Sequence, residues 1–417
     1  MLCRACLVLL LASGSGLATD WPCWRGPTGM GHCDEQNLPL TWGGKDNANV
    51  LWKVPLPGVE AKAAQDQNQS SPIVVGDRIF VTASYWPGAK ADPKAHPEHH
   101  VACYRATDGK LLWDVKVEPG PWLFSDLRGG YTAPTPAADS ERFYVVFGSS
   151  VLAALDHSGK PLWRKEITPF KFDVAFAASP VLFGETVIVQ CDELEQQSRL
   201  VAFDKKTGDV KWEEKRPKVG FAHSTPVLAT IGGKQQLLVS ASNAVQGVDP
   251  ASGKILWTCE AKGDTVSPVF GNGLVYIDTG RGGPAFAVDP TGTGEVTKTH
   301  LKWKLNQMPE GYGSPVISGD HLYRLHSPET LKCLKLATGE TVYSERLPGI
   351  SGASSAIVSG DRIYLASAGK SYVVKAGPTL EILATNDLGD ASPASPAASG
   401  GKIYLKGRKW LYCVGMK

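Results

Sequence analysis

The chain of 417 residues is 42% hydrophobic, which is enough for one large or two smaller globular domains. Its 43 lysines and arginines nearly balance its 41 aspartates and glutamates, and no basic run stands out. This balance argues against nucleic acid as a partner, because proteins that bind nucleic acid gather basic residues on one surface.

The first eighteen residues have the pattern of a secretory signal. Arg4 precedes an apolar run at positions 7–11, and Gly16 and Ala18 supply the small residues that a cleavage site requires. The apolar run is too short to span a bilayer as a helix, and no cysteine follows it at a lipoprotein-type junction. We therefore expect cleavage near Ala18 and a secreted or periplasmic protein without a membrane span.

Residues 19–40 form a short extension ahead of the repeats described below. Cys23 and Cys33 flank its glycine-rich loop, positions 24–32. In an oxidising compartment two such cysteines favour a disulfide. Both lie outside the repeated part of the chain.

From residue 41 onward one phrase occurs seven times and begins an eighth time. It consists of Ser/Thr-Pro, a Gly-Asp-type turn, two apolar strands and then Thr-Gly-Lys-x-x-Trp, as in the stretch from Ser71 to Trp113. The five clearest copies end at Trp113, Trp163, Trp212, Trp257 and Trp303, and the two fading copies at Tyr343 and Leu383. A period of 40–50 residues with about four short strands is typical of propeller blades.

Each part of the phrase has a structural role. The proline suits the first residue of an innermost strand, where a missing N–H costs least. The tryptophan is expected to pack between adjacent blades, with its N–H bonded to a carbonyl. Cys103, Cys333 and Cys413 share one position of the third strand, which predicts small buried hydrophobic residues.

The two ends of the chain complete one blade. The copy that begins at Ser395 supplies three strands and stops, whereas a fourth strand carrying Trp52 stands alone near the start. Pairing them closes the ring and removes an exposed sheet edge. The sequence therefore predicts an all-β fold for residues 41–417: an eight-bladed β-propeller closed by pairing of the N-terminal strand with the C-terminal blade.

The repeat, Ser-Pro-Val-x-x-Gly-Asp-x-x-Tyr followed by Leu-x-x-x-Asp-x-x-Thr-Gly-Lys-x-x-Trp, resembles the pyrroloquinoline-quinone-like (PQQ-like) propeller repeat. The opening at positions 20–27, Asp-Trp-Pro-Cys-Trp-Arg-Gly-Pro, is similar to the start of secreted bacterial members of this group. The resemblance implies either a BamB-like scaffold, which assists outer-membrane protein assembly, or a quinoprotein dehydrogenase with PQQ and calcium on the axis. The chain has no Cys-Cys pair, and no motif matches the calcium ligands or the catalytic aspartate of those dehydrogenases.

Loops of two classes gather on one face of a propeller, around its axis. They lead from an outer strand to the next inner strand, or from a second to a third strand. Arg128 and Arg281 are the strongest binding candidates, because neighbouring glycines allow close approach to a ligand. The binding face that we predict comprises Arg128, Tyr131, His223, Arg281, Tyr312 and His326. Further polar candidates are Asp66, Gln69, Asp126, Asp173, Asp192, Asn243 and Asp264. Solvated loop charges without a ligand remain the alternative for all of them.

His96, His99 and His100 form the one dense histidine run and are weak candidates for a metal site. Their spacing matches no established metal motif, so we expect no metal there. No residue set with a catalytic pattern stands out either.

The sequence favours a non-catalytic secreted propeller that needs no cofactor. It would bind a protein or a cell-envelope polymer through its axial face. The alternatives are a PQQ- and calcium-dependent dehydrogenase of alcohols or sugars, and a carbohydrate- or metal-binding sensor.

Overall fold

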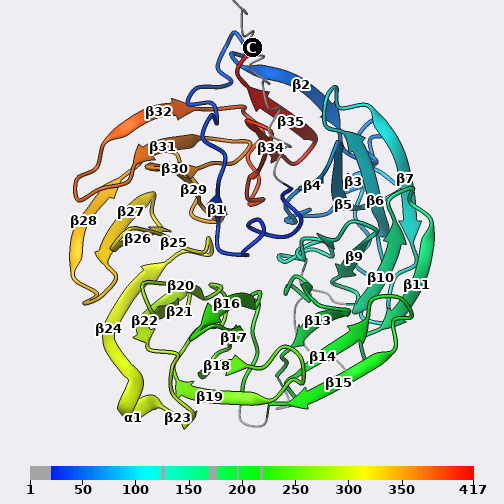
Figure 1. Cartoon of the computed structure of the whole chain (residues 1–417). Helices are drawn as coiled ribbons and strands as arrows, with labels where there is room; N and C mark the ends of the chain where they lie inside the picture. Colours follow the sequence, from blue (N-terminus) through cyan, green and yellow to red (C-terminus); the bar gives the residue numbers. More distant parts are fainter. Residues whose placement is uncertain (1–19, 124–126, 169–175, 195–196, 217–218) are drawn as a thin grey trace, which may run out of the picture.

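The computed structural model describes residues 20–123, 127–168, 176–194, 197–216 and 219–417. Among these residues β-strands dominate, and the only helix is the single turn α1, Thr297–His300. Eight sheets, each built on four antiparallel strands, stand around a central axis (Figure 1). The predicted eight-bladed β-propeller is confirmed. The predicted signal at residues 1–18 lies outside the described residues.

The strands of each blade are given from the axis outward. Blade 1 consists of β4 (Ile73–Val75), β5 (Arg78–Trp86), β6 (Glu98–Arg105) and β7 (Leu111–Val117), and blade 2 of β8 (Ala137–Ala138), β9 (Arg142–Phe147), β10 (Val151–Asp156) and β11 (Pro161–Glu166). Blade 3 consists of β12 (Val181–Phe183), β13 (Thr186–Cys191), β14 (Arg199–Asp204) and β15 (Val210–Lys215), and blade 4 of β16 (Val227–Ile231), β17 (Lys234–Ser240), β18 (Ala244–Val248) and β19 (Ile255–Glu260). Blade 5 consists of β20 (Val269–Gly271), β21 (Leu274–Asp278), β22 (Arg281–Val288) and β24 (Leu301–Glu310), and blade 6 of β25 (Val316–Ser318), β26 (His321–His326), β27 (Thr330–Lys335) and β28 (Thr341–Arg346). Blade 7 consists of β29 (Ile357–Ser359), β30 (Arg362–Leu365), β31 (Ser371–Lys375) and β32 (Ile382–Asn386), and blade 8 of β33 (Ala397–Ser399), β34 (Lys402–Lys406), β35 (Trp410–Gly415) and β2 (Val50–Pro55). Three short strands add to this frame: β3 (Ala64–Gln65) beside β5, β23 (Gly294–Glu295) outside β19, and β1 (His32–Cys33) inside β29.

The ring is closed by strand pairing between the two ends of the propeller. Strand β2 runs antiparallel to β35, with Trp52 opposite Cys413. Figure 1 shows these two strands side by side, blue against red. The predicted place of Trp52, on the outermost strand of the last blade, is confirmed.

Four of the periodic tryptophans each join their blade to the next one through a hydrogen bond. The Trp52 indole N–H donates to the carbonyl of Ala106 at 3.1 Å, and a Cβ at Gly109 would come within 2.8 Å of its ring. The same bond recurs from Trp113, Trp163 and Trp303 to the carbonyls of His157, Lys205 and Leu336. The predicted packing is thus confirmed for these four. Trp257 instead donates to Gln236 of its own blade.

The N-terminal extension lies across one face of the propeller (Figure 1). It pairs with blade 1 through Trp21 and Val74, and it reaches blade 7 where β1 runs parallel to β29. Arg25 is buried between these contacts and donates to the carbonyls of Met30 and Pro315. Burial lowers the pKa of the Arg25 guanidinium to about 9. The extension is thereby attached to the ring on several sides.

The predicted disulfide between Cys23 and Cys33 is not formed, and the structure contains both as free thiols. Cys33 belongs to β1 and lies opposite Ser359 in blade 7. Cys23 instead lines a crevice against the inner strands of blades 2 to 4. The extension crosses the ring between the two cysteines, which is why closeness in sequence does not bring them together. Cys103, Cys333 and Cys413 are buried, as predicted.

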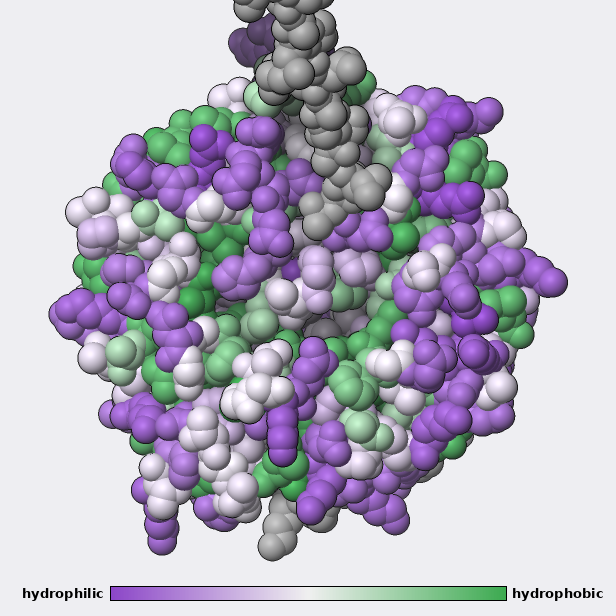
Figure 2. Space-filling model, in the orientation of Figure 1, coloured by the Kyte–Doolittle hydropathy of each residue, from purple (hydrophilic) through white to green (hydrophobic). Residues whose placement is uncertain are grey.

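Hydrophilic residues predominate around the rim of the face shown in Figure 2, with hydrophobic residues interspersed among them. In the part of the chain that the structure describes, no helix is both long and apolar enough to cross a bilayer.

Candidate axial binding site

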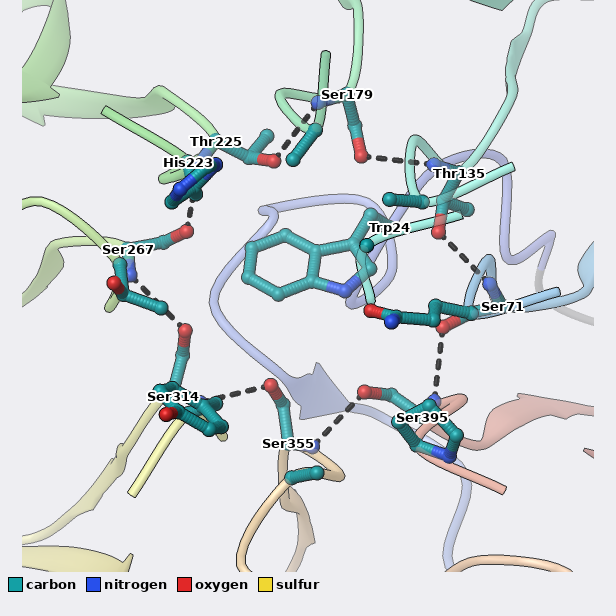
Figure 3. Close-up of a pocket in the computed structure, with 18 of the residues that line it drawn as sticks. Trp24, Ser71, Thr135, Ser179, His223, Thr225, Ser267, Ser314, Ser355 and Ser395 are labelled. Atoms are coloured by element: carbon teal, nitrogen blue, oxygen red, sulfur yellow. Dashed lines mark hydrogen bonds between the residues drawn. The ribbon is translucent and has the colours of Figure 1, made fainter. Parts of the chain in front are cut away.

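The eight innermost strands are joined by a closed ring of hydrogen bonds around the axis. In each blade the residue two positions before the inner strand donates its backbone N–H to the hydroxyl of the equivalent residue in the next blade (Figure 3). The bonds are 2.8–3.1 Å long, and the last runs from Ser395 back to Ser71. The members of this hydroxyl ring are Ser71, Thr135, Ser179, Thr225, Ser267, Ser314, Ser355 and Ser395.

Each ring hydroxyl is buried and accepts one N–H, yet it keeps its own proton. Within the described residues these eight protons have no recorded acceptor. A hydroxyl that already accepts a hydrogen bond is polarised and becomes a better donor. The ring therefore joins the blades and also presents unused donors around the axis.

Removing one hydroxyl is expected to destabilise the ring. In Ser355→Ala the buried N–H of Ser314 loses its acceptor, which should cost about 1–3 kcal/mol in urea unfolding. Ser355→Thr is the matched control, since threonine occupies this position in blades 2 and 4. Equal unfolding midpoints for the two variants would show that the ring does not contribute to stability.

Trp24 of the N-terminal extension closes one end of the axis. A tight turn at Gly26, with φ of 78°, leads the chain back under the ring, where a Cβ would come within 2.8 Å of Trp21. Figure 3 shows the Trp24 indole nearly face-on at the centre of the hydroxyl ring. The Arg25 guanidinium lies 5.4 Å from the centroid of this indole. Trp24 therefore forms the floor of an axial cavity.

This cavity, which we call the axial cup, has a volume of about 410 Å³. Its walls combine the ring with residues of the loops that converge on one face. Besides Trp24 and the hydroxyl ring, it is lined by Gln69, Arg128, Gly129, Ala133, Ala177, His223, Thr265, Arg281, Tyr312, Ala353 and Pro393. Four of the six predicted binding-face residues thus meet in one cavity: Arg128, His223, Arg281 and Tyr312.

Two arginines give the mouth of the cup its charge. The Nε of Arg281 donates to Asp264 Oδ2 at 3.0 Å, while its two terminal nitrogens make no recorded hydrogen bond to the described residues. The Tyr312 hydroxyl donates to Glu310 at 2.5 Å, and this bond raises the pKa of Tyr312. Arg128 and Arg281 line the same cavity as Tyr312, and their positive charges oppose that rise in its pKa.

His223 contributes a neutral imidazole to the wall of the cup. Burial, together with the nearby Arg281 charge, lowers the pKa of His223 to about 4. Its backbone N–H donates to the carbonyl of Asp264 at 2.6 Å, which fixes this segment against the next blade. At neutral pH the imidazole is uncharged and a weak base.

Tyr131 and His326 do not line the axial cup. Tyr131 is fully buried, packs against Trp86 and His99, and donates its backbone N–H to Asp66 at 2.5 Å. His326 is also buried, with Nδ1 3.1 Å from the carbonyl of Ser327. Both side chains are buried instead of lining the cup, and loop position alone does not reveal this.

The three histidines considered for a metal do not converge. His99 lies between the hydroxyls of Ser84 and Ser149, at 3.0 and 2.9 Å, whereas His100 bonds Asp114 at 2.8 Å. Among the described residues no group of three or more metal-ligating side chains occurs.

The other polar candidates are placed as follows. Asp192 is ion-paired with the buried Arg216, and Asn243 accepts from the backbone N–H of Gly220. Asp126 and Asp173 lie outside the described residues.

Two residue sets in the cup were missed by sequence reasoning. The Ser/Thr residues of the hydroxyl ring did carry a signal, because they recur before the inner strand in every blade. Trp24 carried none, since its place on the axis depends on contacts between the extension and distant blades.

Comparison with known proteins gives one family and several relatives. The family of the outer membrane protein assembly factor BamB matches residues 97–345, more than half of the chain. A solved structure of BamB from Moraxella catarrhalis is 14% identical, with a TM-score of 0.62 over 88% of this chain and 97% of that one. A europium-containing methanol dehydrogenase is 12% identical, with a TM-score of 0.55 over 93% and 89% of the two chains. These likenesses of low identity concern the fold.

A curated relative is the tetrathionate hydrolase of Acidithiobacillus ferrooxidans. It is 21% identical over 344 residues, covering 64% of this chain and 64% of that protein. The chain therefore spans slightly less than two thirds of the length of this relative.

Proposed function

The chain belongs to the family of BamB-like propellers, and from that premise we propose that it is a non-catalytic scaffold. It would bind a protein or a cell-envelope polymer through the face on which the axial cup opens. We propose a secreted or periplasmic location, supported by the signal pattern of residues 1–18. The observation that carries the proposal is the axial cup, a closed-ended cavity with arginines and tyrosine at its mouth.

The chemistry of the axial cup supports binding more than catalysis. Efficient general bases have pKa values near the working pH, whereas burial lowers the pKa of His223 to about 4. Two carboxylates are hydrogen-bonded to cup residues, and each is occupied: Asp264 by Arg281, and Glu310 by Tyr312. What remains are donors, a flat aromatic surface and positive charge, which are suited to holding a ligand.

A quinoprotein dehydrogenase would need calcium ligands at the same site. Calcium takes six to eight oxygen ligands, carboxylates among them. At the axial cup Asp264 is paired with Arg281 and Glu310 accepts from Tyr312, so neither carboxylate is free to hold a cation. The residues therefore do not fit this ion, and we propose no redox step and no cofactor.

Partner capture from the native envelope tests the proposed function. We expect Arg128→Gln/Arg281→Gln to retain at most a tenth of the partner that the unmodified protein captures, because the mouth loses its charge. The matched control is Arg105→Gln, which removes an arginine from the end of β6, outside the lining of the axial cup. Both variants should keep the unmodified melting temperature.

Two results would contradict the scaffold function. One is equal capture by the double variant and the unmodified protein. The other is reduction of a dye by the purified protein when PQQ, calcium and an alcohol or sugar are supplied.

A further inference from the structure

The hydroxyl ring and Trp24 together form a surface that matches a polyhydroxylated ring. The Trp24 indole lies nearly face-on at the centre of the ring, so its flat surface is turned along the axis (Figure 3). Flat aromatic faces pack well against the apolar C–H faces of sugar rings, and burial of such faces is a large favourable contribution. The hydroxyl groups that surround the indole would therefore face the edge of a ligand stacked on Trp24.

The edge of that ligand must supply hydrogen-bonding groups. The eight ring protons have no recorded acceptor among the described residues, and a buried donor left unpaired costs about 1–3 kcal/mol. The C–H edge of an aromatic ligand would leave them unpaired. A pyranose carries hydroxyls around its edge, and these can both accept from and donate to the ring.

The mouth selects for a negative group on such a ligand. Guanidinium groups bind carboxylates through paired, charge-assisted hydrogen bonds. The two terminal nitrogens of Arg281 are available for this, because Asp264 occupies only Nε. Arg128 lines the same cavity and adds a second positive charge, while Glu310 is held by the Tyr312 hydroxyl.

The shape of the cup limits which part of a polymer can enter. Its floor is closed by Trp24, so a chain cannot pass through the axis. A volume of about 410 Å³ lies at the small end of ligand cavities, which is enough for a terminal unit. A peptide end would offer a carboxylate but no hydroxylated ring for Trp24 and the hydroxyl ring.

We propose that the axial cup binds the terminal sugar of an acidic polysaccharide, with the pyranose stacked on Trp24 and its carboxylate on Arg281. The inference rests on the proposed function and specifies its partner as an envelope polymer with an acidic sugar at its end. The hydroxyl ring pairs with the sugar hydroxyls, and Arg128 stabilises the negative charge.

A glycan array of acid-ended and neutral-ended oligosaccharides tests the ligand class directly. We expect retention of uronic-acid-ended glycans, with signals at least tenfold above those of their neutral counterparts. Equal signals for acidic and neutral ends, or no retained glycan, would overturn the proposal. Binding of an acidic peptide or of benzoate in place of every glycan would also overturn it.

Calorimetry with the best acid-ended glycan and its neutral counterpart then tests the residues. Arg281→Gln should weaken binding of the acidic form about tenfold and leave the neutral form unchanged, whereas Arg105→Gln should change neither. Trp24→Ala should abolish binding of both forms, and Trp24→Phe should retain it because the flat ring remains. Unchanged affinity in Arg281→Gln and in Trp24→Ala would place the glycan elsewhere.

The two proposals fail in different ways. If no glycan binds but envelope capture still depends on Arg128 and Arg281, the scaffold function holds and the sugar assignment falls. If the glycan binds as expected but envelope capture is insensitive to both arginines, the sugar assignment holds and the scaffold function falls.

Discussion

Deletion of residues 41–56 is expected to give a protein that aggregates or is largely unfolded at 25 °C. The deletion removes β2, which covers the outer edge of β35 in the closing blade. It also removes the half-buried Trp52 from its pocket at Gly109, which should cost less than the about 3–5 kcal/mol of a fully buried tryptophan. An uncovered strand edge adds a site for pairing with other chains. Since whole domains are stable by about 5–15 kcal/mol, most of the margin would be lost.

Size-exclusion chromatography and thermal unfolding by circular dichroism measure this effect. Trp52→Ala is the control, because it empties the pocket but keeps the strand. We expect it to lower the melting temperature while the protein stays monomeric. A monomeric deletion variant with an unchanged melting temperature would show that the ring does not depend on this closure.

The fold could be predicted because its information is local and repeated. Every blade has its own turn glycine and apolar strands, and all but the seventh end in an aromatic residue, so the copies that match the pattern well identify the weaker ones. Closure of the ring could be predicted by counting strands, because the last copy of the repeat has three strands and one strand stands alone near the start of the chain. The pairing of Trp52 with Cys413 confirms that prediction. The extension has no such redundancy. Its crossing of the ring, which separates Cys23 from Cys33, is set by single contacts to distant blades.

The axial cup was predictable only in part, for a related reason. Loop position correctly brought Arg128, His223, Arg281 and Tyr312 to one cavity. It did not reveal that Tyr131 turns inward, because this depends on packing against aromatic residues of the long β5–β6 hairpin, such as Trp86. Side-chain direction in a loop is a tertiary property, and periodicity does not encode it.

The second large effect is expected at the buried ion pair between blades 5 and 6. Arg324 Nε donates to Asp278 Oδ2 at 2.8 Å, and Nη2 to Oδ1 at 3.1 Å, with both side chains shielded from solvent. The same guanidinium donates to the carbonyls of Gly311 and Gly313. These glycines flank Tyr312, so the pair also holds a residue at the mouth of the axial cup.

Asp278→Leu should therefore destabilise the protein by about 3–5 kcal/mol, because a buried guanidinium loses its counter-charge. Urea unfolding of this variant, of Arg324→Met and of the double variant forms a cycle. We expect the double variant to be more stable than the sum of the single losses predicts, by about 1–3 kcal/mol, since no unpaired charge remains.

Asp108→Ala is the control: it breaks the exposed pair with Arg105 and should leave the unfolding midpoint unchanged. If Asp278→Leu behaved like Asp108→Ala, the buried pair would not be what fixes the loop of Tyr312. In that case Asp278→Leu should also leave the affinity for the glycan unchanged. If the buried pair does position Tyr312, this substitution should lower both the affinity for the glycan and the free energy of unfolding.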